Sequence, residues 1–269
     1  MITKLLPPAG VFFMPENPEL KYFLDTQFER LYRPDFIPDD PISVPHSFRQ
    51  KEDIEISGFL TAILSWGQRK MIIQKANNLM IRMDRAPFDF VMHASLHDLK
   101  QIQGFVYRTF NETDCLTIIE ALRNIYSHHG GLESVFTKGF ENQDAFHAIQ
   151  NVHDLIFSYP HLKRSQKHIA NPASGSAAKR LNMYLRWLVR PANCGIDFGL
   201  WKSIHPAQLI CPLDVHSGTT ARKLGILRRK QNDRRAAEEL TAALRMFDQE
   251  DPVKYDFVLF GLGTEGFNR

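Results

Sequence analysis

Residues 177–190 read AAKRLNMYLRWLVR, and this stretch decides the fold class that the sequence predicts. Its apolar residues recur at the three- and four-residue spacing of one helix face, so they predict a helix with a buried stripe. The stripe consists of Leu181, Tyr184, Leu185 and Leu188. Four cations are predicted to lie off it: Lys179, Arg180, Arg186 and Arg190.

The helical period continues on both sides of this stretch. Apolar faces at that spacing recur near residues 56–64, 71–83, 116–126 and 146–157. Capping side chains at Asp233 and Asp251 predict two more helices near the C-terminus. Because no convincing strand, glycine-rich phosphate loop or fixed repeat interrupts this pattern, the sequence predicts an all-α fold.

Prolines divide the chain into two predicted parts. Residues 1–50 form a proline-rich arm that we expect to pack on the body, with one helix beginning at Asn17-Pro18. Residues 51–269 form a helical body, in which the stretch 161–225 contains the predicted hairpin and the candidate catalytic residues.

The charge of residues 155–232 stands out against a chain whose net charge is +3. This segment contains 13 Lys and Arg but only the carboxylates of Asp197 and Asp214, a balance of 13 − 2 = +11, so the rest carries +3 − 11 = −8. Such a segment predicts a polyanionic partner. The alternative is a solvated basic face with no partner.

The cysteines and the N-terminus predict a cytoplasmic protein. Cys115, Cys194 and Cys211 are odd in number and far apart, which excludes a disulfide framework and a CxxC-type metal or cluster site. The first residues lack the long apolar run of a secretory signal, and no later run predicts a membrane span.

Two residues in the basic segment are candidates for chemistry. Pro172 and Gly175 predict a tight turn before the helix, and backbone N–H groups at a helix start favour an anion. Lys179 falls in the first turn of that helix beside Arg180, where an amine should lose its proton more easily and become nucleophilic. Asp214 follows an apolar and proline-containing run and predicts the start of another helix.

These elements resemble a known enzyme superfamily. The segments KRLNMYLR at residues 179–186 and LDVH at residues 213–216 are similar to the lysine and aspartate elements of the helix-hairpin-helix (HhH-GPD) DNA glycosylases. Among these they look most like the 8-oxoguanine DNA glycosylase/AP lyase branches. The resemblance implies a two-lobed helical bundle, Lys179 as the nucleophile and Asp214 as the catalytic carboxylate. The whole chain also looks like a bacterial family that carries only an uncharacterised label.

The resemblance also implies a partner and its contacts. The partner would be double-stranded DNA with a damaged base, 8-oxoguanine being favoured, and a monomer is favoured for the protein. No cofactor is expected apart from a monovalent cation at the hairpin. Six residues are expected to contact nucleic acid: Gly175, Ser176, Arg180, Arg186, His216 and Arg222. Three are expected to line the base pocket: Trp66, Gln68 and Phe267.

The sequence departs from the superfamily pattern in three places. The hairpin, Pro172-Ala173-Ser174-Gly175-Ser176, keeps one glycine where two are usual. The interval from Lys179 to Asp214 is 35 residues, which implies an insertion after Pro191. The four closely spaced cysteines of the iron–sulfur relatives are absent.

Simpler interpretations stand beside each assignment. Lys179 could be a solvated or phosphate-contacting cation, and Asp214 could be only a helix cap. His216 favours a structural or phosphate-binding role over a metal site, because no second ligand stands at zinc spacing. Trp66 could belong partly to the core and Gln68 could simply end a helix. A non-catalytic HhH-type protein that binds DNA or RNA is therefore the main alternative, and an acidic protein partner is a third.

Overall fold

The computed structural model describes residues 17–141 and 144–266, and these residues are mostly helical. The chain divides into two compact units, each with a core of its own. The first unit combines residues 1–36 with residues 174–269, and the second is continuous from Ile37 to Ala173. The predicted all-α fold is confirmed. The described residues also contain one short antiparallel pair, β1 (Val106–Tyr107) with β2 (Phe110–Asn111), which was not predicted from the sequence.

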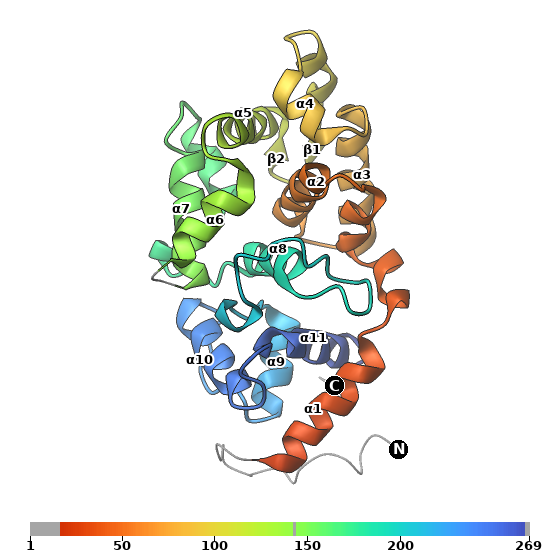
Figure 1. Ribbon diagram of the computed structural model, residues 1–269, viewed down its shortest axis with the longest axis vertical. Helices are drawn as coiled ribbons and strands as arrows, with labels where there is room; N and C mark the ends of the chain where they lie inside the picture. Colours follow the sequence, from red (N-terminus) through yellow and green to blue (C-terminus); the bar gives the residue numbers. More distant parts are fainter. Residues whose placement is uncertain (1–16, 142–143, 267–269) are drawn as a thin grey trace. The chain divides into compact units, whose positions relative to one another are not determined.

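The first unit joins the chain's N-terminal helix to its C-terminal third (Figure 1). α1 (Pro18–Leu31) begins at Asn17, whose side chain accepts the N–H of Leu20 as predicted. The other elements of the unit are α8 (Lys179–Val189), η8 (Pro206–Gln208), α9 (Val215–Lys223), α10 (Arg234–Arg245), η9 (Pro252–Tyr255) and α11 (Asp256–Thr264). α11 packs against both α9 and α1, so it lies at the centre of the unit's contacts.

The second unit is built from the middle of the chain (Figure 1). Its α-helices are α2 (Lys51–Leu64), α3 (Arg69–Arg82), α4 (Pro87–His93), α5 (Glu112–His128), α6 (Gly131–Phe140) and α7 (Ala145–Ile156). Its short helices are η3 (Pro41–Ser43), η4 (Pro45–Ser47), η5 (Asp98–Ile102) and η6 (Lys163–His168), while η2 (Pro34–Asp39) and η7 (Pro172–Ser174) span the junctions between the units.

A glycine permits the closest helix pairing of the second unit. A Cβ added to Gly139 of α6 would lie 2.3 Å from the Cα atom of Ala148 in α7. No side chain fits at that separation, so the two helices approach with their backbones nearly in contact. α6 was not predicted from the sequence, because Gly130-Gly131 reads as a helix end. The glycines do end α5, but a new helix begins at once at Gly131.

The observed division differs from the predicted boundary at residue 50. The arm's helix α1 belongs to the first unit, through its contact with α11, and the residues from Ile37 belong to the second. The reason is that the arm's two halves bury apolar side chains in different cores. Leu20, Phe23 and Leu24 are buried from α1, and Ile42 and Val44 are buried near η3. The basic segment 155–232 is also divided, at residue 173.

Candidate functional site

Lys179 begins α8, in the first unit. The preceding turn has positive φ at Gly175 (+89°) and at Ala178 (+48°), and the N–H of Ala178 donates to the hydroxyl of Ser176 at 3.1 Å. Left-handed geometry at an alanine is sparsely populated and costs about 1 kcal/mol. The helix therefore starts at Lys179 from a tightly bent loop, and the lysine side chain retains 28% of its exposure.

Asp214 caps the start of α9, as its position in the sequence predicts. Its Oδ1 accepts the N–H of Ser217 at 3.0 Å, and the Ser217 hydroxyl accepts the N–H of Asp214 at 2.9 Å. This reciprocal capping box satisfies two backbone donors of the helix start. The carboxylate keeps 25% of its exposure, so it is fixed in place without being removed from solvent.

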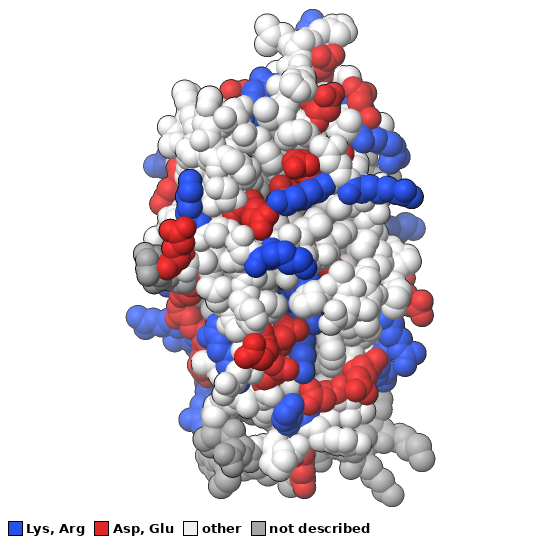
Figure 2. Space-filling model, in the orientation of Figure 1, with Lys and Arg blue, Asp and Glu red and all other residues white. Residues whose placement is uncertain are grey.

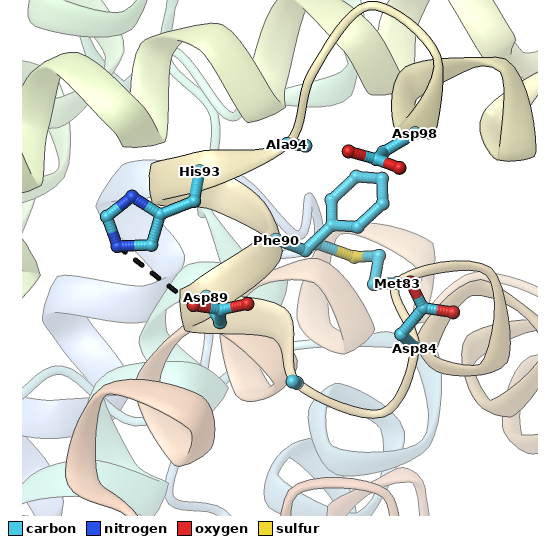
Figure 3. Close-up of a pocket in the computed structure, with 8 residues that line it drawn as sticks. Met83, Asp84, Asp89, Phe90, His93, Ala94 and Asp98 are labelled. Carbon is cyan, nitrogen blue, oxygen red and sulfur yellow. Dashed lines mark ion pairs between the residues drawn. The ribbon is translucent and has the colours of Figure 1, made fainter.

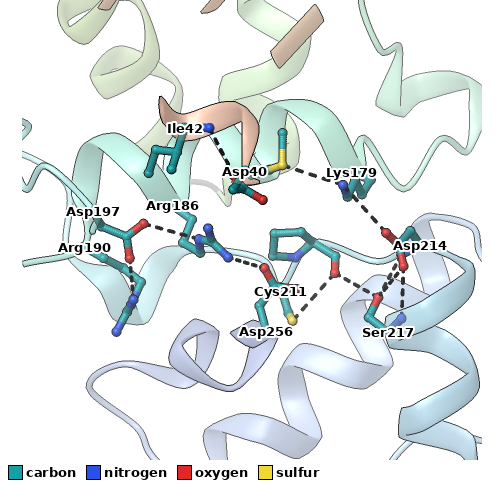
Figure 4. A network of polar contacts seen from close by, with 12 residues as sticks. Asp40, Ile42, Lys179, Arg186, Arg190, Asp197, Cys211, Asp214, Ser217 and Asp256 are labelled. Atoms are coloured by element: carbon teal, nitrogen blue, oxygen red, sulfur yellow. Dashed lines mark hydrogen bonds and ion pairs between the residues drawn. The ribbon is translucent and has the colours of Figure 1, made fainter. Parts of the chain in front are cut away.

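The side chains of Lys179 and Asp214 point toward one another (Figure 4). The Lys179 Nζ atom lies 3.7 Å from Asp214 Oδ2, the oxygen that does not accept the Ser217 N–H. Capping and ion pairing thus use different oxygens of one carboxylate. The helix cap consequently orients the carboxylate toward the amine. Asp214 can therefore cap α9 and pair with Lys179 at the same time.

α11 brings an aromatic ring to the same place. The Phe260 ring centroid lies 6.0 Å from Lys179 Nζ and 6.2 Å from the ring centroid of His216, which it meets edge-on. The Nζ atom also lies 3.6 Å from the sulfur of Met183. An amine near an aromatic face and a thioether has fewer water contacts than a free lysine. Phe260 was missed in the sequence because it stands in an apolar helix that reads as core.

A buried carboxylate, Asp256, stands one turn before Phe260 in α11 and pairs with Arg186 of α8. Burial raises the pKa of Asp256 to about 6, with Asp214 acting in the same direction and with Arg186 and Lys179 opposing. Asp256 is therefore electrostatically coupled to both members of the Lys179–Asp214 pair. This coupling could not be predicted from the sequence, in which Asp256 stands in the first turn of an apolar helix.

We expect this pKa to make stability depend on pH. Between pH 4 and 6 the folded protein keeps the Asp256 proton that the unfolded chain loses, so raising the pH weakens the fold. Relative to Asp256→Asn, which cannot ionise, the wild-type free energy of unfolding should fall by about 1–3 kcal/mol over this range. Urea unfolding of both proteins at pH 4, 5, 6 and 7 measures the difference. A difference that is constant, or that grows with pH, would contradict the assignment.

Arg186 was expected to contact DNA, and the structure places its side chain in the core. Its side chain is 5% exposed, pairs with Asp256, lies 3.5 Å from Asp197 and stacks on Phe257 at 4.2 Å. Arg190, also expected to lie off the buried stripe, is 4% exposed and pairs with Asp197 (Figure 4). It also pairs with Asp251. The physical reason is that carboxylates from distant segments enter the core and neutralise both guanidinium groups.

Arg222 also has a different environment from the one expected. Its guanidinium donates to the carbonyl of Arg229 at 2.8 Å, to the carbonyl of Gln231 at 3.2 Å and to the side chain of Asn232 at 2.6 Å. These bonds fold the loop after α9 back onto the helix. Arg222 therefore holds this loop through its Nε and Nη2 atoms.

The remaining predicted DNA contacts lie near the start of α8 or α9. Gly175 is exposed, and a Cβ added there would meet nothing within 4 Å, so its backbone is open to an approaching group. Ser176 and Arg180 are half-buried on either side of Lys179 in the chain, and His216 is exposed. The structure thus gathers Gly175, Ser176, Arg180 and His216 around the ends of the helices that carry Lys179 and Asp214.

Two of the three residues predicted for the base pocket, Trp66 and Gln68, belong to the second unit. The Arg108 guanidinium lies 4.6 Å from the Trp66 ring, and Gln68 is exposed before α3. The Trp66 carbonyl accepts the Tyr107 hydroxyl at 2.8 Å. Phe267 lies outside the described residues.

A pocket of the second unit is acidic and unrelated to these predictions. It lies between α4 and its neighbouring turns, and three carboxylates and His93 border it (Figure 3). His93 lies 4.0 Å from Asp89. The lining residues are Met83, Asp84, Ala86, Asp89, Phe90, His93, Ala94 and Asp98. A negatively charged pocket disfavours a phosphate ligand, so it does not fit the predicted polyanion.

The predicted charge excess is partly neutralised by the fold. Arg164, Lys179, Arg186, Arg190 and Arg229 all belong to the basic segment, and each forms an ion pair with a carboxylate. On the face shown in Figure 2, Lys and Arg side chains are interspersed with Asp and Glu side chains. The count of +11 therefore overstates the positive charge that a partner would meet.

Three carbonyls at and just after the hairpin, of the kind that a monovalent cation would need as ligands, accept hydrogen bonds. That of Gly175 accepts the N–H of Arg234 at 2.9 Å and that of Ala177 accepts the Asn182 side chain at 3.0 Å. The Ala178 carbonyl accepts two helical N–H groups. Within residues 17–141 and 144–266, no group of three or more His, Cys, Asp or Glu side chains could hold a metal ion.

Comparison with known proteins gives a family without an established activity. A family model described as "Protein of unknown function (DUF2400)" matches residues 40–265, which is most of the chain. No curated protein and no solved structure matches the sequence. Among the described helices, none combines the length and the apolar character that crossing a membrane requires.

Proposed function

We propose that this chain, which belongs to the family of unknown function DUF2400, is a DNA N-glycosylase with AP lyase activity. One observation carries the proposal: the Lys179 amine lies 3.7 Å from the Asp214 carboxylate, and both side chains are about one quarter exposed. The two residues come from the starts of different helices and are 35 positions apart. A nucleophile and a carboxylate must converge in this way to act on one substrate atom.

The contacts of each group suit a separate role in the reaction. Lys179 can reach solvent yet stands beside Phe260 and Met183, which gives an amine some shelter from water. Asp214 is oriented by the Ser217 N–H and presents its other oxygen to the amine. Such a preorganised carboxylate can stabilise positive charge that develops near it.

The chemistry follows from these roles. A base stacked in a duplex must first be turned out of the helix. In the proposed reaction, neutral Lys179 attacks C1′ of the deoxyribose while the bond from C1′ to the base breaks, and the base leaves with the electron pair and takes up a proton. Asp214 stabilises the oxocarbenium-like transition state. Ring opening then yields an imine between C1′ and Nζ, and loss of a C2′ proton expels the 3′ phosphate.

The proposed DNA contacts are those that remain at the surface near the pair. The exposed backbone at Gly175 and the half-buried Ser176 precede α8, and His216 lies in the first turn of α9. Backbone N–H groups near helix starts are suited to phosphate oxygens. We also propose, from the sequence resemblance, that the fold is a two-lobed HhH-GPD bundle in a cytoplasmic protein and that oxidised guanine is the lesion.

Trapping with sodium borohydride tests the proposal. Wild-type protein mixed with a duplex containing 8-oxoguanine or an abasic site should form a covalent adduct after reduction, because borohydride converts the imine into a stable amine. Lys179→Ala should form none. Persistence of the adduct in Lys179→Ala, or absence of any adduct with wild type on either duplex, would contradict the proposal.

Asp214→Asn provides a matched variant, because asparagine caps a helix as well as aspartate does. The capping bond from Ser217 should survive and the carboxylate charge should be lost. We expect the free energy of unfolding to change by less than about 1 kcal/mol, while the rate of adduct formation falls on the order of a hundredfold. Equal rates for wild type and Asp214→Asn would remove Asp214 from the reaction.

A non-catalytic nucleic-acid-binding protein is the second candidate. The exposed turn at Gly175 and the exposed His216 would contact a phosphate backbone whether or not chemistry followed. Both candidates predict binding that weakens strongly with salt, so affinity does not separate them. Salt-dependent binding with no borohydride adduct would favour this second function.

A further inference from the structure

Residues 232–234 contact both of the elements that carry the Lys179–Asp214 pair. The Asn232 side chain donates to the carbonyl of Asp214 at 3.0 Å. Two residues later, the N–H of Arg234 donates to the carbonyl of Gly175, in the turn before Lys179, at 2.9 Å. The residue between them, Asp233, forms an antiparallel bridge with Ser176. We call residues 232–234 the tie segment.

The tie segment is itself anchored at its start. The Asn232 Oδ1 atom accepts Arg222 Nη2 at 2.6 Å, so its amide bridges the guanidinium and the Asp214 carbonyl. The same guanidinium holds the carbonyls of Arg229 and Gln231. The orientation of the amide is thereby determined, because its oxygen faces a donor and its nitrogen faces an acceptor.

Asp233 anchors the middle of the tie segment. Its carboxylate caps α10 by accepting the N–H of Ala236 at 3.0 Å and pairs with Arg229, whose Nε lies 2.7 Å away. The Arg229 guanidinium lowers the pKa of Asp233 to about 2, so the carboxylate stays ionised in neutral solution. The residue that forms the bridge to Ser176 is therefore held in place by its capping bond to α10 and its ion pair with Arg229.

Gly218 of α9 leaves space for the Asn232 amide. A Cβ at this position would lie 2.7 Å from Asn232 Oδ1 and 2.9 Å from Arg222 Nη1. The N–H of Gly218 donates to the same Asp214 carbonyl that Asn232 contacts, at 2.9 Å. A side chain would push the amide away, which explains a glycine in the first half of a helix.

From these contacts we propose that Asn232 is a positioning residue that keeps the Asp214 carboxylate against the Lys179 amine. It does so by holding the backbone of Asp214 while the rest of the tie segment holds the turn before Lys179. The effect on the pair's geometry stands on the contacts alone. Its effect on catalysis rests on the proposed glycosylase function.

Asn232→Asp tests the geometric part without requiring any activity. The new carboxylate keeps an oxygen for Arg222 but places a second oxygen against the Asp214 carbonyl, so the link to Asp214 is replaced by repulsion. Because the ion pair with the Asp214 carboxylate restrains the amine, loosening the pair should speed acetylation of Lys179 by an acetylating reagent about two- to fivefold, the range expected for one partly exposed ion pair. Asn232→Ala should have the same effect, and peptide mass spectrometry measures the rate at each lysine.

Two comparisons make the result specific. Gln231→Ala removes an exposed amide one residue away and leaves the backbone carbonyl that Arg222 contacts, so Lys179 should react as in wild type. Lys254 of the same unit, whose side chain is 16% exposed, should react unchanged in all variants. A Lys179 rate that stays at the wild-type value in both Asn232 variants, or a rise shared equally by Lys254, overturns the inference.

The catalytic consequence has its own measurement. With a duplex containing an abasic site, the single-turnover cleavage rate of Asn232→Ala should fall on the order of tenfold while the Kd for the DNA is unchanged, since this variant loosens the pair without adding a charge. A wild-type protein without lyase activity would refute the proposed function, and the acetylation rates would still decide the role of Asn232. Wild-type activity with an unaltered rate in Asn232→Ala would refute the catalytic consequence.

Discussion

Replacement of Lys179 by glutamine is expected to reduce the rate of base excision and strand cleavage at least about a thousandfold, because it removes the attacking amine. Glutamine keeps a comparable length and polarity, so the packing against Met183 and Phe260 should persist. The Kd for the same duplex should rise no more than about tenfold, as for the loss of one cation near DNA. Single-turnover cleavage and a binding titration at one salt concentration measure the two quantities.

Lys202→Gln is the matched control for this experiment. Lys202 is an exposed lysine of the same unit, between α8 and α9 in the chain. Its replacement should leave the cleavage rate unaltered while removing the same charge. If Lys179→Gln retained more than a tenth of the wild-type rate, or if both variants lost activity equally, Lys179 would not be the nucleophile.

Replacement of Asp197 by alanine is expected to lower the free energy of unfolding by about 3 kcal/mol, because it removes a shared partner of two buried arginines. The Asp197 side chain is completely buried, pairs with Arg190 and lies 3.5 Å from Arg186. Burial raises the pKa of Asp197, and the two guanidinium groups oppose this effect. Asp251 and Asp256 remain as partners after the change, so the loss should lie at the lower end of the range for a broken buried pair.

Urea unfolding at pH 7 measures the effect of Asp197→Ala. Asp35→Ala is the comparison, since Asp35 belongs to the same unit and is exposed, and its loss should change stability by less than about 0.5 kcal/mol. A loss of less than 1 kcal/mol in Asp197→Ala would show that the buried arginines do not depend on this carboxylate.

The helices could be predicted from the sequence because their apolar spacing and caps are local signals. The cap at Asn17, the start of α9 at Asp214 and the cap of α10 at Asp233 all lie where the sequence placed them. Each depends on a side chain and backbone groups within three residues. α6 was not predicted, because Gly130-Gly131 is a local signal for the end of a helix and does not show that another helix begins there.

The burial of Arg186 and Arg190 could not be predicted, because it depends on contacts between segments that are separate in the sequence. Arg186 on α8 and Arg190 just after it were expected to be surface cations, because both lie off the predicted apolar stripe. Their partners come from the connector after α8 and from the region around η9 and α11, up to 70 residues away. A charge count along the chain cannot separate a cation that meets a partner molecule from one that meets a buried carboxylate.

Only some residues of the candidate site could be identified from the sequence. Lys179 and Asp214 were singled out by their positions at helix starts in the basic segment and by the resemblance of two short segments to a glycosylase superfamily. Their separation of 3.7 Å was not deducible from an interval of 35 residues. Phe260, Asp256 and Asn232 were not found at all. Asp256 and Phe260 lie in the apolar helix α11, and Asn232 lies in a polar loop. Each contacts the candidate site through residues that are distant in the sequence.

Mapping the borohydride-reduced adduct to a residue tests the central claim most directly. Wild-type protein is reduced with a duplex containing an abasic site, the adduct is digested with protease and nuclease, and the peptide that retains the sugar remnant is sequenced by mass spectrometry. The remnant should be found on the Nζ atom of Lys179. A remnant on another lysine or on the terminal amine, or no adduct at all, would contradict the account.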